Sequence, residues 1–127
     1  MNQQNTLLTA AILGCLSVGL GAFGAHALKE TLTASGRVET YELAVKYQFY
    51  HTLALLAIGL LMGKIPGPPL MISSVLIASG VVLFSGSLYL LALTSLRFVV
   101  FLTPLGGVLM LAGWATMAYA ILTKKPW

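Results

Sequence analysis

The stretch GLGAFGAHAL, residues Gly19–Leu28, ends the first long apolar run of the chain and carries His26, one of only two histidines. The whole run, 7–28, is long enough at 1.5 Å per helical residue to cross a hydrocarbon core of about 30 Å. A second stretch, KYQFYHT at Lys46–Thr52, opens another apolar run and carries the second histidine, His51. These two stretches predict two membrane-spanning helices whose polar residues meet at one membrane surface.

The composition places the rest of the chain in a membrane as well. Of its 127 residues, 58% are hydrophobic and only 8% are charged, whereas roughly 25% of the residues of a soluble domain are charged. The formal charge of +4 comes from basic residues that flank the apolar runs, which is usual at membrane surfaces. We therefore expect no nucleic-acid partner. The single cysteine, Cys15, excludes an intrachain disulfide and a cysteine-based metal site.

Four apolar runs predict four spans in one membrane domain. Their expected bounds are 7–28, 47–63, 70–93 and 99–122. Three prolines and a glycine in the sequence KIPGPP at 64–69 must end the second span. The connection 94–98 is so short that the third and fourth spans must be antiparallel neighbours. We expect an all-α integral membrane protein, an antiparallel bundle of four transmembrane helices. The basic residues of the two surfaces are too evenly divided to orient it.

The connection between the first two spans, 29–46, holds all three acidic residues of the chain. From Val38 its apolar positions fall on one side of a helix and its charged positions elsewhere, which predicts an interfacial helix that runs, straight or bent, into the second span. Glu42 and Lys46 are four apart, a spacing that favours a weak ion pair on a solvated helix face. Because every acid lies in this connection, carboxylate chemistry within the spans is excluded.

The first run also resembles a secretory signal peptide, because Ala25-His26-Ala27 has the pattern of a cleavage site. No basic residue precedes the run, and the run is long, so we expect a retained helix.

Small residues in the spans predict close helix packing. In the first span they recur at steps of three and four, which places them on one helical face. This face leaves room for a neighbouring helix or, alternatively, for a lipid or ligand. The residues assigned to packing are Gly14, Ser17, Gly21 and Gly24, together with Gly86 between two serines of the third span. Pro104 is expected to kink the fourth span.

Alternating span direction gathers a polar cluster at one membrane surface. Its expected members are His26, Tyr47, Gln48, Tyr50, His51, Tyr89, Arg97 and Thr103. Three roles remain open for the two histidines. They can belong to a hydrogen-bond network that joins the first two spans, take part in proton-linked or ligand-binding chemistry, or ligate a metal or haem. The third role lacks the three or four ligands that a zinc site needs, so we assign no catalytic residue, metal or cofactor.

Five blocks of the chain together resemble one family. They are GAFGAH at Gly21–His26, YQFYHT at Tyr47–Thr52, FSGSLY at Phe84–Tyr89, TPLGG at Thr103–Gly107 and AGW at Ala112–Trp114. In this order they are similar to the signature blocks of the small membrane family known as domain of unknown function 423, which includes the eukaryotic transmembrane protein 256. The resemblance implies four transmembrane helices and a bacterial inner-membrane location. It implies no established activity.

The sequence favours a non-enzymatic structural or accessory membrane component, which contacts lipid and forms a homo-oligomer or joins a larger membrane complex. The alternative is a proton-linked or small-solute transporter or channel component that acts as an oligomer. A redox or lipid-modifying enzyme that uses the histidines is a third hypothesis.

Overall fold

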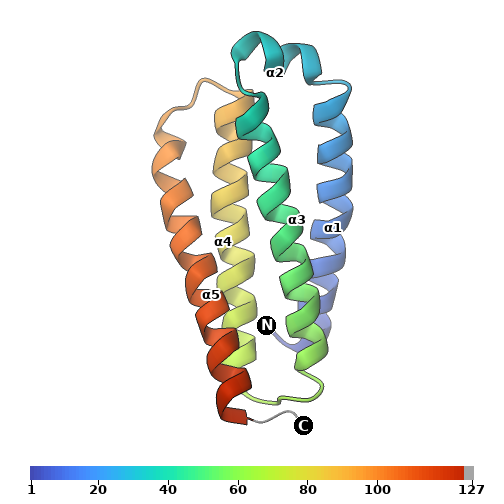
Figure 1. Ribbon diagram of the computed structural model, residues 1–127, viewed down its shortest axis with the longest axis vertical. Coiled ribbons are helices and arrows are strands. Elements are labelled where there is room, and N and C mark those ends of the chain that lie inside the picture. Colours follow the sequence, from blue (N-terminus) through green and yellow to red (C-terminus); the bar gives the residue numbers. More distant parts are fainter. Residues whose placement is uncertain (125–127) are drawn as a thin grey trace.

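The chain folds into five α-helices and one short 3-10 helix in a computed structural model, which describes residues 1–124 (Figure 1). The elements are α1 (Gln3–Ala25), α2 (Lys29–Ser35), α3 (Val38–Leu61), α4 (Pro68–Leu93), η1 (Phe98–Phe101) and α5 (Leu102–Lys124). No strand occurs among these described residues. Four helices, α1, α3, α4 and the continuous pair of η1 and α5, are long and apolar enough to cross a membrane. The prediction of an all-α protein with four membrane spans is confirmed.

The four long helices stand side by side in a curved row, in the order in which they occur along the chain (Figure 1). α1 packs on α3, α3 on α4, and α4 on α5. The inner helices are the more buried ones. In the most apolar part of each helix, 44% of the residues of α3 and 39% of those of α4 are buried, against 11% for α1 and 22% for η1 and α5. The two inner helices therefore contact protein on two sides, whereas the two outer helices face mainly outward.

Local sequence explains where the helices begin and end. The Asn2 side chain accepts a hydrogen bond of 2.8 Å from the Asn5 N–H and caps α1. Pro68 opens α4, where a missing N–H costs nothing. The preceding Gly67 has a φ of 128°, a backbone conformation that residues other than glycine rarely adopt. The proline-rich connection thus ends α3 and starts α4, as predicted.

The connection between α1 and α3 contains one helix that the sequence did not predict. Lys29–Ser35 forms the separate helix α2, which ends at Gly36 with a φ of 69°. Residues 38–46 belong to α3, which continues without interruption to Leu61. No glycine or proline separates the amphipathic segment from the apolar run, so the helix that begins at Val38 runs into the second span, the straight form of the two that the sequence allowed. The interfacial position of α2 stays a prediction.

Pro104 lies close to the point where η1 passes into α5. It lies in the first turn of α5, directly after the change from 3-10 to α geometry between Phe101 and Leu102. In the first turn of an α-helix the N–H groups lack intrahelical partners, so proline is tolerated there. The 3-10 turn η1 directly precedes this position, and the kink at Pro104 stays a prediction.

The small residues of α1 face α3. A Cβ atom added to Gly14 would lie 3.3 Å from Cγ2 of Thr52, and one added to Gly21 would lie 3.4 Å from Cγ1 of Val45. A Cβ atom added to Gly24 would collide with the ring of Tyr41, which also belongs to α3. Ser17, the fourth small residue, is buried. Gly86 does not take the packing role expected of it. Nothing lies within 4 Å of the position of its Cβ, because it lines an open groove between α1 and α4.

The closest approach of two helices is between α4 and α5. A Cβ on Gly106 would lie 2.7 Å from the carbonyl oxygen of Gly80, and a Cβ on Gly80 would lie 2.8 Å from the carbonyl oxygen of Gly106. The two backbones can meet only because both positions lack side chains. Sequence analysis did not assign a packing role to either glycine.

Candidate functional site

Gln48 links three of the four spans by hydrogen bonds. Its side chain is buried, with 3% of its surface exposed. Its Nε2 donates a hydrogen bond of 3.1 Å to the Leu13 carbonyl on α1, and its Oε1 accepts one of 2.7 Å from the Tyr89 hydroxyl on α4. Because lipid offers no alternative partners, these bonds hold α1 and α4 against α3.

Tyr41 makes a second connection between the same helices, closer to the N-terminal end of α3. Its hydroxyl donates a hydrogen bond of 2.5 Å to the Leu20 carbonyl on α1. Its ring packs edge-on against Tyr89, with the ring centroids 5.3 Å apart. Tyr41 is 1% exposed, so this polar residue is part of the core.

His51 connects α3 to α5. Its Nδ1 lies 2.8 Å from the Tyr47 carbonyl oxygen, and its Nε2 lies 3.2 Å from Nε1 of Trp114. The indole of Trp114 can only donate, so Nε2 accepts that bond and Nδ1 donates to the carbonyl. These partners assign a neutral imidazole with its proton on Nδ1. The ring also stacks on Tyr47 at a centroid distance of 5.9 Å.

The structure divides the predicted polar cluster. Gln48 lies with Tyr89, Tyr47 lies with His51, and Thr103 shares a bond of 2.6 Å with Ser87. The remaining members, His26, Tyr50 and Arg97, are exposed and take part in none of these side-chain bonds. The two histidines therefore do not form a joint network between the first two spans. His26 ends α1 at the surface, whereas His51 turns toward α5.

Two residues of this hydrogen-bonded layer were not assigned by sequence reasoning. Tyr41 falls on the apolar side of the helix that begins at Val38, and helical periodicity carries no information about a hydroxyl contact with α1. Trp114 was recognised only as part of the AGW block. Its partner could not be found from spacing, because His51 and Trp114 are 63 positions apart.

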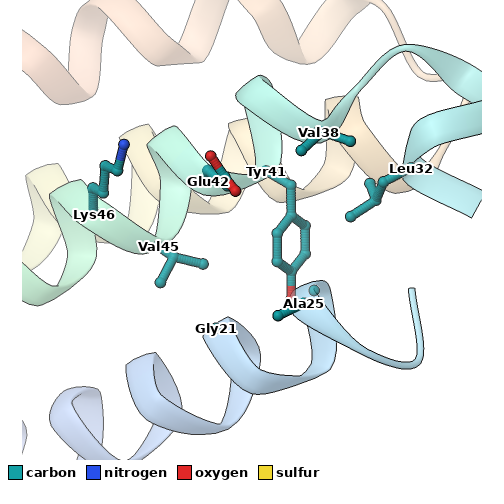
Figure 2. Close-up of a pocket in the computed structure, with 9 residues that line it drawn as sticks. Gly21, Ala25, Leu32, Val38, Tyr41, Glu42, Val45 and Lys46 are labelled. Carbon is teal, nitrogen blue, oxygen red and sulfur yellow. The ribbon is translucent and has the colours of Figure 1, made fainter. Parts of the chain in front are cut away.

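A pocket of about 260 Å³ lies between α1, α2 and α3, and we call it the α1/α3 pocket (Figure 2). It is lined by Gly21, Gly24, Ala25, Leu32, Val38, Tyr41, Glu42, Val45 and Lys46. Figure 2 shows Tyr41 and Val45 extending from α3 toward α1, with Glu42 and Lys46 beside them on α3. The lining is apolar apart from these two charges and the Tyr41 hydroxyl.

A second cavity, about 430 Å³, opens between α3 and α5, and we call it the α3/α5 groove. The aromatic rings of Tyr47, Phe84 and Trp114 line it together with His51 and the small residue Gly107. The ring centroids of Tyr47 and Phe84 are 4.7 Å apart. Within residues 1–124, no three side chains of the types His, Cys, Asp and Glu gather as potential metal ligands.

Relatives of this chain are membrane proteins. Over 127 residues it is 46% identical to the UPF0382 inner membrane protein YgdD of Escherichia coli strain K12, an alignment that covers 98% of this chain and 95% of the relative. It is 44% identical over 110 residues to the UPF0382 membrane protein SSP2132 of Staphylococcus saprophyticus, which covers 85% and 88% of the two chains. These names state a membrane location and no enzymatic activity. No solved structure matches the chain.

A family model described as "Protein of unknown function (DUF423)" matches residues 20–107. The match includes the end of α1, all of α2, α3, α4 and η1, and the start of α5. It therefore contains the whole lining of the α1/α3 pocket, but only the part of the α3/α5 groove that precedes Val108. With its inner-membrane relatives and its four spans, this chain is an integral protein of the bacterial inner membrane that belongs to the DUF423 family, whose activity is unknown.

Proposed function

We propose that this protein is a non-enzymatic accessory component of the membrane that acts by lateral association with other transmembrane helices. The observation that carries this proposal is the use of its polar side chains. In the described part of the chain, no buried side-chain nitrogen or oxygen lacks a hydrogen-bond partner. Catalysis or transport needs polar groups that are free to engage a substrate. Here those of Gln48, Tyr41 and His51 hold the helices together instead.

The outer helices support lateral association. Val18 on α1 is 67% exposed and Leu111 on α5 is 71% exposed, so both helices turn apolar surface away from the protein. Apolar surface alone does not drive helices together in lipid, where association depends on close packing. The open row leaves both edges accessible for such packing against a second copy of the chain or against another membrane protein.

The native cysteine provides the test. Cys15 is exposed on α1 and is the only thiol, so a short thiol crosslinker applied to native membranes reports neighbours of α1. A variant with Cys15→Ser and Leu111→Cys reports neighbours of α5 in the same way. We expect a crosslinked product at one of the two edges, of twice the monomer mass for self-association or of another mass for a different partner. Cys15→Ser alone is the matched control.

If only the monomer is found after crosslinking at Cys15 and after crosslinking at Leu111→Cys, the result would contradict the proposal. The transport alternative is favoured by one observation, the position of His51 on the wall of the α3/α5 groove. Liposomes that contain the wild type and His51→Phe distinguish the two functions. Proton or solute flux that exceeds that of empty liposomes and disappears in His51→Phe would replace the accessory role by a transport role.

A further inference from the structure

α3 differs from the other long helices because it carries charges well inside its length. Glu42 lies about 6 Å and Lys46 about 12 Å along the helix from its start at Val38. A contact with α4 gives the same depth: the Ser85 hydroxyl donates to the Ala44 carbonyl over 2.7 Å, and Ser85 lies about 12 Å from the end of α4. Glu42 and Lys46 therefore lie beside neighbouring spans and not in a loop.

Within residues 1–124, no salt bridge with a nitrogen–oxygen distance of 4.0 Å or less joins Glu42 or Lys46 to another residue. The ion pair expected between Glu42 and Lys46 from their spacing is absent, and Figure 2 shows their charged ends standing apart on the same side of α3. Both side chains are exposed. Glu42 follows Tyr41, whose ring packs on Gly24 in the last turn of α1, so both charges lie near that end of the bundle and can meet polar groups from outside the protein.

The α1/α3 pocket adjoins these two charges. Gly21 and Gly24 contribute no side chains to it, while Leu32 and Val45 give it apolar walls. A ligand that fits this site combines an apolar part for the pocket with a headgroup that carries both a negative and a positive charge. A glycerophospholipid with a zwitterionic headgroup has this combination.

The order of the two charges selects the headgroup. The Lys46 ammonium belongs to the deeper residue, and the Glu42 carboxylate lies one helical turn nearer the surface. In phosphatidylethanolamine the phosphate is attached to the glycerol and the ammonium lies farther out, so each lipid charge faces its opposite on α3. The primary ammonium can also donate hydrogen bonds to a carboxylate. A quaternary choline has no N–H to donate, and a phosphatidylglycerol headgroup has no cation.

We propose that the α1/α3 pocket binds one phosphatidylethanolamine molecule, with its phosphate at Lys46, its ammonium at Glu42 and its acyl chains on the deeper side of the pocket, beside Gly21 and Val45. This site is separate from the edges of the row that the proposed function uses, and it does not depend on lateral association.

The test measures lipid binding to the purified full-length protein by native mass spectrometry, with phosphatidylethanolamine, phosphatidylcholine and phosphatidylglycerol of identical acyl chains. The wild type is expected to prefer phosphatidylethanolamine to each of the others by about fivefold, the size expected for one charge contact near a membrane surface. Glu42→Gln should lose the preference over phosphatidylcholine. Lys46→Gln should weaken the binding of all three phospholipids.

Two comparisons make the result specific to the site. Lys29→Gln and Glu30→Gln remove the same charges from exposed positions of α2 outside the pocket, and they should bind like the wild type. The double variant Glu42→Lys/Lys46→Glu keeps the net charge but reverses the order of the charges, and it should lose the preference. Circular dichroism checks that each variant is folded.

Three outcomes would overturn the proposal. The first is a wild type that binds the three lipids equally, and the second is a reversed variant that keeps the preference. The third is displacement of the lipid by soluble phosphoethanolamine at a comparable concentration, which would assign the site to a free zwitterion instead of a lipid.

Discussion

The indole N–H of Trp114 donates a hydrogen bond to Nε2 of His51 over 3.2 Å, and within residues 1–124 it is the side-chain hydrogen bond that joins α5 directly to α3. The other interhelical side-chain bonds of α5 involve α4, from Ser73 to the Gly113 carbonyl and between Ser87 and Thr103. Both rings lie near the middle of their helices. The bond therefore holds α5 to the row from a second direction, near the middle of both helices.

Removing this bond should destabilise the protein modestly. Trp114→Phe keeps an aromatic ring but removes the donor, and we expect the free energy of unfolding to fall by about 0.5–1.5 kcal/mol. Unfolding in mixed micelles with increasing SDS measures it. Tyr119→Phe, at an exposed position of the same helix, is the control. The combination of Trp114→Phe with His51→Phe should be less destabilising than the sum of the two single changes. An additive result would show that the two rings are energetically independent.

Gln48→Leu should be more destabilising than Trp114→Phe. The substitution leaves the Tyr89 hydroxyl and the Leu13 carbonyl without their interhelical partner, and each stranded group costs about 1–3 kcal/mol. Thr52→Val is the matched control, because the Thr52 hydroxyl bonds only to the Gln48 carbonyl of its own helix. The measurement is the thermal unfolding midpoint of Gln48→Leu, Trp114→Phe and Thr52→Val in one detergent, each compared with the wild type. If Thr52→Val lowers the midpoint as much as Gln48→Leu does, the interhelical bonds of Gln48 are not what stabilises the row.

Gly106→Ala should separate α4 from α5. The added Cβ would lie 2.7 Å from the Gly80 carbonyl oxygen, and backbone atoms cannot move aside as a flexible side chain can. We expect a cost of several kcal/mol, at the upper end of the range for overpacking, visible as a lower unfolding midpoint and faster proteolysis. Gly86→Ala places a Cβ where nothing lies within 4 Å, so it should be neutral or slightly stabilising. Equal effects of the two substitutions would contradict the observed approach of the helices.

Gly24→Ala should weaken the packing of α1 on α3. The new methyl group would collide with the Tyr41 ring, and displacing that ring disturbs the bond from its hydroxyl to the Leu20 carbonyl. Hydrogen exchange is the appropriate measurement, with faster exchange expected in α1 than in α5. Gly19→Ala is the control, because its Cβ would contact nothing within 4 Å. Uniformly faster exchange along the chain would indicate global destabilisation and not a local effect at this interface.

The number and approximate place of the spans could be predicted because a residue that faces lipid and a residue that faces another helix are both apolar. The hydropathy along the chain therefore locates a span without knowledge of its neighbours. The order KIPGPP was equally decisive, since prolines and glycine act locally on the backbone. The packing of the spans could not be predicted in the same way. A membrane helix is apolar on every side, so α4 shows no apolar face that distinguishes α3 from α5 or from lipid. Gly80 and Gly106 meet across two helices, and only the three-dimensional arrangement pairs them.

Polar residues show the same limit. Tyr47 and His51 are four apart on one helix, and their common face was readable from the sequence. The partner of His51 was not, because a histidine in a span can turn toward either neighbour. The charged residues Lys29 and Lys46 flank the two histidine-containing stretches, and for that reason the sequence predicts both histidines near one surface. α3 extends to Val38, however, and His51 lies near its middle, far from the exposed end of α1 that carries His26.

The row has the same order in space as in the chain, and this identity has a consequence for biosynthesis. When α3 emerges, α1 is already present as its packing partner; α4 then finds α3, and α5 finds α4. Each new helix can pack on the helix synthesised before it without displacing an existing contact. The main packing partner of each helix is its neighbour in the row, so none depends on a helix that is synthesised much later. The chain can thus assemble by successive addition of neighbours during insertion, a route that keeps loop closures short.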